Sequence, residues 1–150
     1  MALRNIRKYG DEILRKKCRV VDEINERILT LIKDMAETMY KADGVGIAAP
    51  QVGILKRIFV IDVYDGEGTR VFINPEILEK DGEQIDVEGC LSLPGEQGEV
   101  KRPERVKVKA LDMNGNEFTL SAEGLLARAI CHENDHLDGI LFVDHVEKQD

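Results

Sequence analysis

The periodic stretches of this sequence follow one another in the order helix, strands, helix, and this order limits the fold more than any other feature does. In the first helical stretch, apolar side chains recur every three or four residues and therefore share one helix face. They are Ile24, Ile28, Leu31, Ile32, Met35, Ala36 and Met39. We expect Asp22 to cap this helix and Asp43-Gly44 to end it, and a second helix to run from about 121–123 to Leu137. Because strands are not interleaved with helices, the sequence predicts an α+β fold and not a doubly wound parallel sheet.

The region between the two helices contains short apolar runs that predict strands. These runs cover residues 57–63, 71–74, 84–88, 106–111 and 117–120. Residues 65–68 form a turn-like break, and Asn114-Gly115 supplies the residues that a tight type I′ hairpin requires. Elsewhere we expect a short helical turn over 12–16, capped by Asp11, and a terminal strand or turn over 140–143.

Length and composition favour one globular domain over residues 1–150. The sequence has no Pro-, Gly- or Ser-rich linker, no repeat and no apolar run near the roughly 18 residues of a membrane span. Charge from Arg4 onward argues against a secretory signal. Twenty-one basic and 29 acidic residues give a net charge of −8, which disfavours binding to nucleic-acid backbones. Three cysteines without an export signal predict reduced thiols in a cytoplasmic protein.

The strongest chemical signal is the segment His132-Glu133-Asn134-Asp135-His136, which falls on the second predicted helix. Residues four apart lie on one helix face, so His132 and His136 can present two imidazoles to one metal ion. Glu133 lies one step around the helix and can reach a metal-bound water. The competing interpretation is a charged, solvated helix face that matches the pattern by chance.

Two histidines leave a catalytic metal site one protein ligand short. The extended pattern H-E-x-x-H-x-x-G-x-x-H requires a histidine where this chain has Phe142, and the only glutamate downstream of the motif is Glu147. Cys90, at the end of a predicted strand, is the best upstream candidate because Cys/His/His sets occur at catalytic metal sites. The alternative for Cys90 is a small buried apolar residue. Cys18 and Cys131 are weaker ligand candidates.

A third segment, Gly44-Val45-Gly46-Ile47-Ala48-Ala49-Pro50-Gln51, joins the first helix to the first strand. Its small residues let a ligand approach the backbone closely. The Gln51 amide can donate a hydrogen bond to a carbonyl oxygen or an oxyanion. The alternative is a tight connection without a chemical role.

Together, three segments resemble the signature motifs of the peptide deformylase family. They are residues 44–51, Glu88-Gly89-Cys90-Leu91-Ser92 and residues 132–136, and they occur in the family's order over nearly the whole chain. The resemblance implies an α+β fold in which antiparallel and mixed strands surround a central helix that carries the H-E-x-x-H motif. It also implies a metal-dependent hydrolase that removes the N-formyl group from the N-terminal formylmethionine of newly made proteins and releases formate.

The resemblance assigns roles to individual residues of this chain. The implied metal ligands are Cys90, His132 and His136. It further implies Glu133 as the general acid and base, with the Gln51 amide and the Leu91 backbone N–H as oxyanion donors. The positions that match the family's peptide-binding residues are Val45, Gly46, Gly89, Leu125 and Ala129. Of these, Gly46 and Gly89 are expected to pair with the peptide backbone, and the other three to line the methionine pocket.

Three charged residues are expected behind the ligands, namely Glu88, Arg102 and Asp135. A ligating imidazole usually donates its second N–H to a carboxylate or carbonyl, so Glu88 and Asp135 are candidate orienting groups. Arg102 resembles the family arginine that pairs with the motif glutamate. A surface ion pair worth little is the alternative.

The resemblance also implies a cofactor and partners. Fe(II) is the usual family metal, with Zn(II), Ni(II) or Co(II) substituting, although a thiolate and two imidazoles by themselves favour zinc over iron. It implies a cytoplasmic monomer that acts on N-formylmethionyl nascent peptides. We also expect no direct binding to membranes or to nucleic acid, the latter because of the net charge of −8. In some members a further C-terminal helix contacts the ribosome; this sequence stops soon after Asp144, so ribosome contact is left open.

One position departs from the family pattern. Arg128 replaces an apolar residue that some members have near the methionine pocket, and we expect its aliphatic stem to line the wall while its head reaches water.

Two other classes compete with the deformylase interpretation. A metallopeptidase would use the same helix motif without Cys90, but Phe142 argues against it. A peptide-binding module would have lost its metal, but the implied ligands and Glu133 are all present. A metal titration separates that module from an enzyme.

Overall fold

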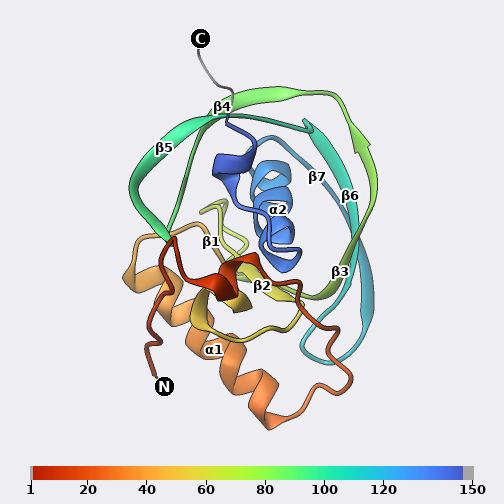
Figure 1. Ribbon diagram of the computed structural model, residues 1–150. Helices are drawn as coiled ribbons and strands as arrows, with labels where there is room; N and C mark the ends of the chain where they lie inside the picture. The colour runs from red at the N-terminus through yellow and green to blue at the C-terminus, as the bar shows by residue number, and fades with distance from the viewer. Residues whose placement is uncertain (1, 147–150) are drawn as a thin grey trace.

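A computed structural model describes residues 2–146 and places one α-helix inside a wall of antiparallel strands (Figure 1). The helices are α1, Glu26–Lys41, and the enclosed α2, Gly124–Leu137. The strands are β1 Gly46–Ala48, β2 Ile58–Ile61, β3 Arg70–Asp81, β4 Gln84–Cys90, β5 Leu93–Arg102, β6 Arg105–Leu111 and β7 Glu117–Glu123. Single turns of 3₁₀ helix cover Glu12–Arg15, Ala49–Val52 and Phe142–Asp144. The α+β prediction, with strands around a central helix that carries the H-E-x-x-H motif, is confirmed. Glu147 lies outside the described residues.

Within residues 2–146, the strands form two antiparallel sheets. One has five strands in the order β1-β2-β3-β6-β7, and the other consists of β4 and β5. In Figure 1, β4 and β5 arch over one end of α2 while β3, β6 and β7 run along its side. Because α2 packs inside this wall, groups on the inner side of β4 can meet groups on the helix.

The strand β2 is buried on both faces, which explains why its segment of the sequence is continuously apolar. Ile58 and Val60 pack in the core cluster that contains the apolar face of α1, whereas Phe59 and Ile61 pack in the cluster that contains α2. Successive side chains of a strand point to opposite faces. The sheet therefore separates α1 on its outer side from α2 on its inner side.

The helix α2 ends at a glycine turn. The N–H of Ile140 donates to the carbonyl of Asp135 at 2.9 Å, and Gly139 has a φ of 75°. This is the Schellman arrangement, in which a left-handed residue just after the helix lets the chain turn back. It stops the helix directly after the turn that carries His136.

The N-cap prediction for α1 is wrong by three positions. The side chain of Asn25, not Asp22, accepts a hydrogen bond from the N–H of Ile28 at 3.1 Å. Both residues are good caps, so residue type alone does not choose between them. Ile24 therefore lies before the helix, where it packs against the edge of the core.

The predicted two-residue hairpin at Asn114-Gly115 is also wrong. The turn is closed by a hydrogen bond from Asp112 N to Asn116 O at 3.0 Å, which leaves a three-residue loop. The Asp112 carboxylate accepts from the N–H groups of Asn114 and Asn116, and only Gly115 has positive φ. A side chain that bonds the backbone two residues ahead thus selects the longer turn.

Strand β3 continues well past its predicted end at Asn74. A bulge at Asn74 accommodates Pro75, which would otherwise interrupt the strand. Asn74 has a φ of 52°, and the register shifts between Ile73 and Glu76. Its side chain pairs with the backbone of Val21, accepting from N at 2.7 Å and donating to O at 3.0 Å. A bulge is where a sheet tolerates proline.

The remaining element boundaries differ less from the predicted ones than the end of β3 does. Residues 140–143, predicted as a strand or a turn, contain the start of the last 3₁₀ turn. The strands β1 and β5 have no counterpart among the predicted strands.

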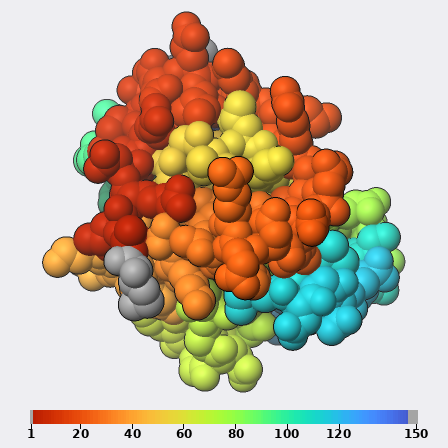
Figure 2. Space-filling model, turned by 90° about the horizontal axis from the view of Figure 1, so that it is seen from below, coloured from red at the N-terminus to blue at the C-terminus, as the bar shows by residue number. Residues whose placement is uncertain are grey.

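The outer face of the sheet is covered by α1 and the N-terminal segment. Figure 2 shows α1, in orange, crossing this face between the red N-terminal segment and the cyan turn that joins β6 to β7. Arg7 N donates to Gln51 O at 2.7 Å, and Tyr9 N donates to Ser92 O at 2.7 Å. The N-terminal segment thus braces two of the motif segments. No helix within residues 2–146 is both long enough and apolar enough to cross a membrane.

Candidate metal centre

The three residues implied as metal ligands lie together. Cys90 ends β4, whereas His132 and His136 follow one another by one turn of α2. One ligand atom from each lies within 4.8 Å of the others, and Cys90 Sγ is 3.3 Å from His136 Nε2. The other two thiols are buried elsewhere, and burial raises the pKa of Cys18 and of Cys131 to about 11.

The donor set and its spacing fit a divalent transition metal. Tetrahedral nitrogen and sulfur ligands at 2.0–2.3 Å from an ion lie roughly 3.5 Å from one another, close to the observed separation of Cys90 Sγ and His136 Nε2. The Nδ1 atom of His132 is engaged by Glu88 at 2.8 Å, which leaves its Nε2 free to ligate. Three protein ligands leave a coordination position open for water, as catalytic sites require.

Glu133 lies beside this cluster and is buried. One oxygen of its carboxylate is 3.9 Å from His132 Nε2, and the other has no hydrogen-bond partner among residues 2–146. Burial raises the pKa of Glu133 to about 7. A Cβ on Gly46 would lie only 2.6 Å from Glu133 Oε2, so the glycine leaves the space that this carboxylate occupies.

The carboxylate of Glu88 contacts one candidate ligand and one arginine in the expected way. Its Oε1 lies 2.8 Å from His132 Nδ1. Arg102 donates to it twice, from Nε at 2.8 Å and from NH2 at 2.9 Å. Burial alone would raise the pKa of Glu88, but hydrogen bonds from Arg102 and His132 outweigh burial and hold that pKa well below its usual range. Glu88 is therefore a fixed negative charge behind His132.

Asp135 does not take the orienting position that the sequence reasoning gave it. Among residues 2–146 its side chain has no hydrogen bond to His132 or His136. It accepts instead from Arg102 NH1 at 2.6 Å and lies 3.0 Å from His145 Nε2. Arg102 thus lies between the carboxylates of Asp135 and Glu88, and Asp135 contacts this group only through the arginine.

The expectation for Arg128 is wrong for the head of its side chain, although the residue does line the cleft beside the cluster. Its head does not reach water, because the side chain is only 6% exposed. The guanidinium donates instead to Glu88 and to the carbonyl of Val100. The cause is helix geometry: Arg128 lies one turn before His132 on the face of α2 that meets β4 and β5.

Gln51 approaches the cluster from the other side. Its Oε1 accepts from Ala48 N at 2.9 Å, and its Nε2 lies 3.5 Å from Cys90 Sγ. Nε2 also donates to Ser92 Oγ at 3.1 Å. Ser92 and Leu91 form the two-residue turn between β4 and β5. These bonds fix the amide of Gln51 next to the candidate ligands.

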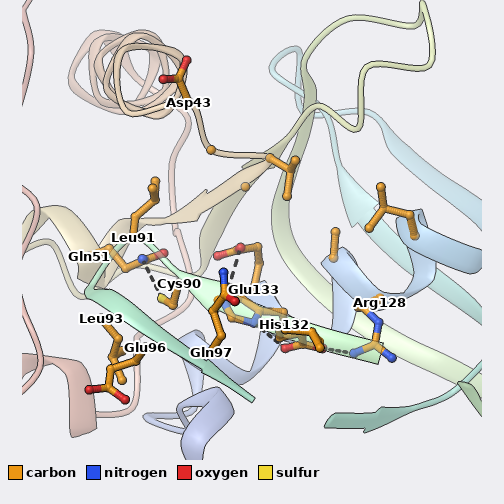
Figure 3. A pocket seen from close by; sticks show the side chains of 18 of the residues that line it. Asp43, Gln51, Cys90, Leu91, Leu93, Glu96, Gln97, Arg128, His132 and Glu133 are labelled. Atoms are coloured by element: carbon orange, nitrogen blue, oxygen red, sulfur yellow. Dashed lines mark hydrogen bonds and ion pairs between the residues drawn. The ribbon is translucent and has the colours of Figure 1, made fainter. Parts of the chain in front are cut away.

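A cleft of about 370 Å³ opens beside the cluster. Its lining includes all five positions expected to bind peptide, namely Val45, Gly46, Gly89, Leu125 and Ala129. Val45 and Leu125 expose apolar side chains there. Figure 3 shows Gln51 and Cys90 on one side of the cleft, with Glu133 and His132 facing them from α2.

Sequence reasoning missed several contributors to this site. Ser92 lies in the second motif, but nothing in the sequence indicates that its hydroxyl accepts a hydrogen bond from the Gln51 amide. Glu96 and Gln97 line the cleft from β5, a strand that was not predicted. A signal was available for Arg128, because its spacing of four from His132 already placed it on the ligand face.

The site combines a thiol, two imidazoles and a buried glutamate beside an open cleft of an α+β fold. A metal-dependent hydrolase requires this combination of groups. Comparison with known proteins narrows this class to one family. Residues 3–150 match the family model of polypeptide deformylases. The chain belongs to the peptide deformylase family, the hydrolases that remove the N-formyl group from the N-termini of nascent proteins.

Individual relatives agree with this assignment over their full lengths. The chain is 70% identical to peptide deformylase 1 of Clostridium perfringens over 145 residues, which are 97% of this chain and 99% of that protein. It is 66% identical to a peptide deformylase of Clostridium botulinum over 99% of this chain and 100% of that one. The crystal structure of peptide deformylase from Thermotoga maritima superposes with a TM-score of 0.95 at 44% identity, covering 99% of this chain and 100% of that one.

Proposed function

We propose that this chain hydrolyses the formyl amide of N-terminal formylmethionine at a metal centre built on Cys90, His132 and His136. One observation carries the proposal: one ligand atom from each of the three residues lies within 4.8 Å of the others, and the Glu133 carboxylate is buried directly beside them.

The chain's own residues can carry the proton and charge movements of the reaction. A divalent metal, when bound, supplies a Lewis acid and lowers the pKa of a water molecule. Glu133 accepts the proton of the attacking water and later gives it to the departing amine nitrogen. The water oxygen forms a bond to the formyl carbon, and the carbon–nitrogen bond then breaks as the nitrogen takes the proton from Glu133, so the products are formate and a free amino terminus.

In this proposal, the Gln51 amide and the Leu91 backbone N–H stabilise the negative charge on the formyl oxygen. The Gln51 amide is fixed beside Cys90 by Ala48 and Ser92, and the Leu91 backbone N–H lies in the turn that follows Cys90. Loss of one such donor typically lowers the rate by about 10²–10³-fold.

The cleft accommodates the peptide beside the cluster. Gly46 and Gly89 have no side chain to block a backbone that pairs with β1 and β4. The side chains of Val45, Leu125 and Ala129 offer apolar surface to the methionine side chain. Glu88 orients His132, Arg102 holds Glu88, and Asp135 acts on this pair only through Arg102.

Further parts of the proposal rest on family membership. Fe(II) is the proposed resident metal, with Zn(II), Ni(II) and Co(II) as substitutes. The protein works as a cytoplasmic monomer on N-formylmethionyl nascent peptides, and residues 1–150 form one catalytic domain.

Formate release from a formyl-Met tripeptide tests the proposal. Protein prepared anaerobically with Fe(II) is expected to release formate rapidly. Glu133→Ala is expected to keep its metal and to lose about 10²–10⁴-fold in rate, because the proton carrier is gone. Cys90→Ser is expected to lose metal, because a hydroxyl is a far weaker ligand than a thiolate.

Two matched variants control for these changes. Glu117→Ala removes an exposed glutamate of β7, and Cys18→Ser alters a thiol that is not part of the ligand cluster. Both are expected to retain metal and rate. Full activity of Glu133→Ala would contradict the role proposed for Glu133. Cleavage of internal peptide bonds without formate release would instead identify the protein as a peptidase.

A further inference from the structure

We infer that Arg128 is a positioning residue of the metal centre: it ties α2 to the β4–β5 sheet and, together with Arg102, holds Glu88 where it aims His132. The inference rests on the proposed function, because it takes Cys90, His132 and His136 as the ligands.

The guanidinium of Arg128 is buried and each of its nitrogens has an acceptor. NH1 donates to Glu88 Oε2, Nε to Gln84 Oε1 at 3.2 Å, and NH2 to the carbonyl of Val100 at 3.0 Å. The first two acceptors belong to β4 and the third to β5. One planar group on the helix thus reaches both strands of the second sheet.

These contacts complete the environment of Glu88. Its Oε1 contacts Arg102 NH2 and His132 Nδ1, and its Oε2 contacts Arg102 Nε and Arg128 NH1. Each oxygen therefore has two partners. Two arginines approaching from different elements fix the carboxylate more closely than one can, because the carboxylate cannot turn about the Arg102 contact without losing Arg128.

The location of Arg128 matters because the ligands come from separate elements. Cys90 belongs to β4, whereas His132 belongs to α2. Glu88 precedes Cys90 by two residues on the strand, and Arg128 precedes His132 by one turn on the helix. The Arg128–Glu88 contact therefore joins the two elements close to the ligands that each one carries. It sets how far the Cys90 thiol lies from the imidazoles.

A merely structural arginine would make the same contacts, so the test needs more than stability or activity. Metal affinity and the visible spectrum of bound Co(II) report directly on ligand geometry. Arg128→Met keeps the long stem and removes the guanidinium, while Arg102 remains to pair with Glu88. Arg128→Lys keeps a charge but cannot reach three acceptors as a planar fork can.

We expect Arg128→Met to weaken Co(II) binding by about 10-fold, the lower end of the usual effect of losing a direct partner of a ligand, because Arg128 acts on His132 through Glu88. Its Co(II) absorption bands should shift in position or intensity, and kcat for formate release should fall more than KM changes. Arg128→Lys should give an intermediate dissociation constant. Arg105→Met, which removes an exposed arginine of β6 paired with Asp81, should match the wild type in all three measurements.

A folded Arg128→Met protein with the dissociation constant and spectrum of the wild type would overturn the inference, whatever its thermal midpoint. If Arg128→Met does not fold, Arg128→Lys decides: weakened Co(II) binding supports the inference and wild-type binding overturns it. Failure of the proposed function has a different signature. In that case the wild type itself would bind no stoichiometric metal or release no formate.

Discussion

Glycine 46 shows how one missing side chain shapes the reactive part of this molecule. A Cβ at this position would lie 2.6 Å from Glu133 Oε2, well inside van der Waals contact. Glu133 is buried at this point, so its carboxylate has little room to retreat. Gly44, two residues earlier, differs in one respect: its Cβ would meet Leu91 Cδ1, the end of a partly exposed side chain.

We therefore expect Gly46→Ala to lower kcat by about 10²-fold, because a displacement of about 1 Å in a catalytic group costs roughly that factor. Gly44→Ala should lower kcat by less than about 10-fold, since the Leu91 side chain can rotate away. Steady-state kinetics of formate release, with metal content measured on the same samples, compare the two variants. Equal rates in both would show that the Gly46 contact does not set the position of Glu133.

At the scale of elements, the end of α2 decides where the chain can go after the last candidate ligand. Gly139 adopts positive φ, and a Cβ there would run into the backbone of Arg15 in the first 3₁₀ turn. The glycine is thus needed both for the turn and for close packing against the N-terminal segment. Gly66 adopts a similar φ of 88° in the loop after β2, but a Cβ there would meet no atom of the described residues within 4 Å.

Substitutions at these two glycines distinguish the free-energy cost of backbone strain from the cost of a packing clash. Gly66→Ala should cost about 1–2 kcal/mol, the usual cost of a left-handed conformation with a side chain. Gly139→Ala should cost more, because it adds a clash with the Arg15 backbone that no rotamer relieves. Urea unfolding with unchanged m values measures both costs. Equal midpoints for the two variants would contradict the packing argument.

At the scale of the whole molecule, the candidate metal centre joins the two-stranded sheet to the central helix. Cys90 reaches it from the two-stranded sheet and both histidines from α2. A ligand that binds only the folded state adds its binding free energy to the stability of the fold. Metal binding should therefore stabilise the entire chain, and not only the loops around the cleft.

We expect Co(II) at about 100 times its dissociation constant to raise the free energy of unfolding by roughly 2.7 kcal/mol. For a chain of this size the thermal midpoint should rise by about 5–10 °C. Calorimetry of metal-free and loaded protein checks this, with Mg(II) as the control, because Mg(II) prefers oxygen ligands. The same midpoint with and without Co(II) would contradict a site that spans these elements.

Local pattern determined much of this protein. The apolar stripe of α1 and the spacing of His132 and His136 depend on helix periodicity alone, so the sequence predicts them without knowledge of the fold. The order of the elements, which also follows from local patterns along the chain, predicted the α+β class. Where two local signals competed, the sequence could not choose: Asp22 and Asn25 are equally good caps, and only the path of the chain selected Asn25.

Tertiary structure decided which groups meet around the candidate metal centre. Glu88 lies 44 residues from His132 and 40 from Arg128 in the sequence, yet it contacts both. No periodicity links residues so far apart, because their meeting depends on how β4 packs over α2. The burial of Arg128 has the same origin: its stem and charge favour the surface, and only the acceptors on β4 and β5 let it stay inside. The sequence thus determined the segments and their chemistry, and packing of the layers determined the partners, because buried polar groups must find their hydrogen bonds wherever the fold provides them.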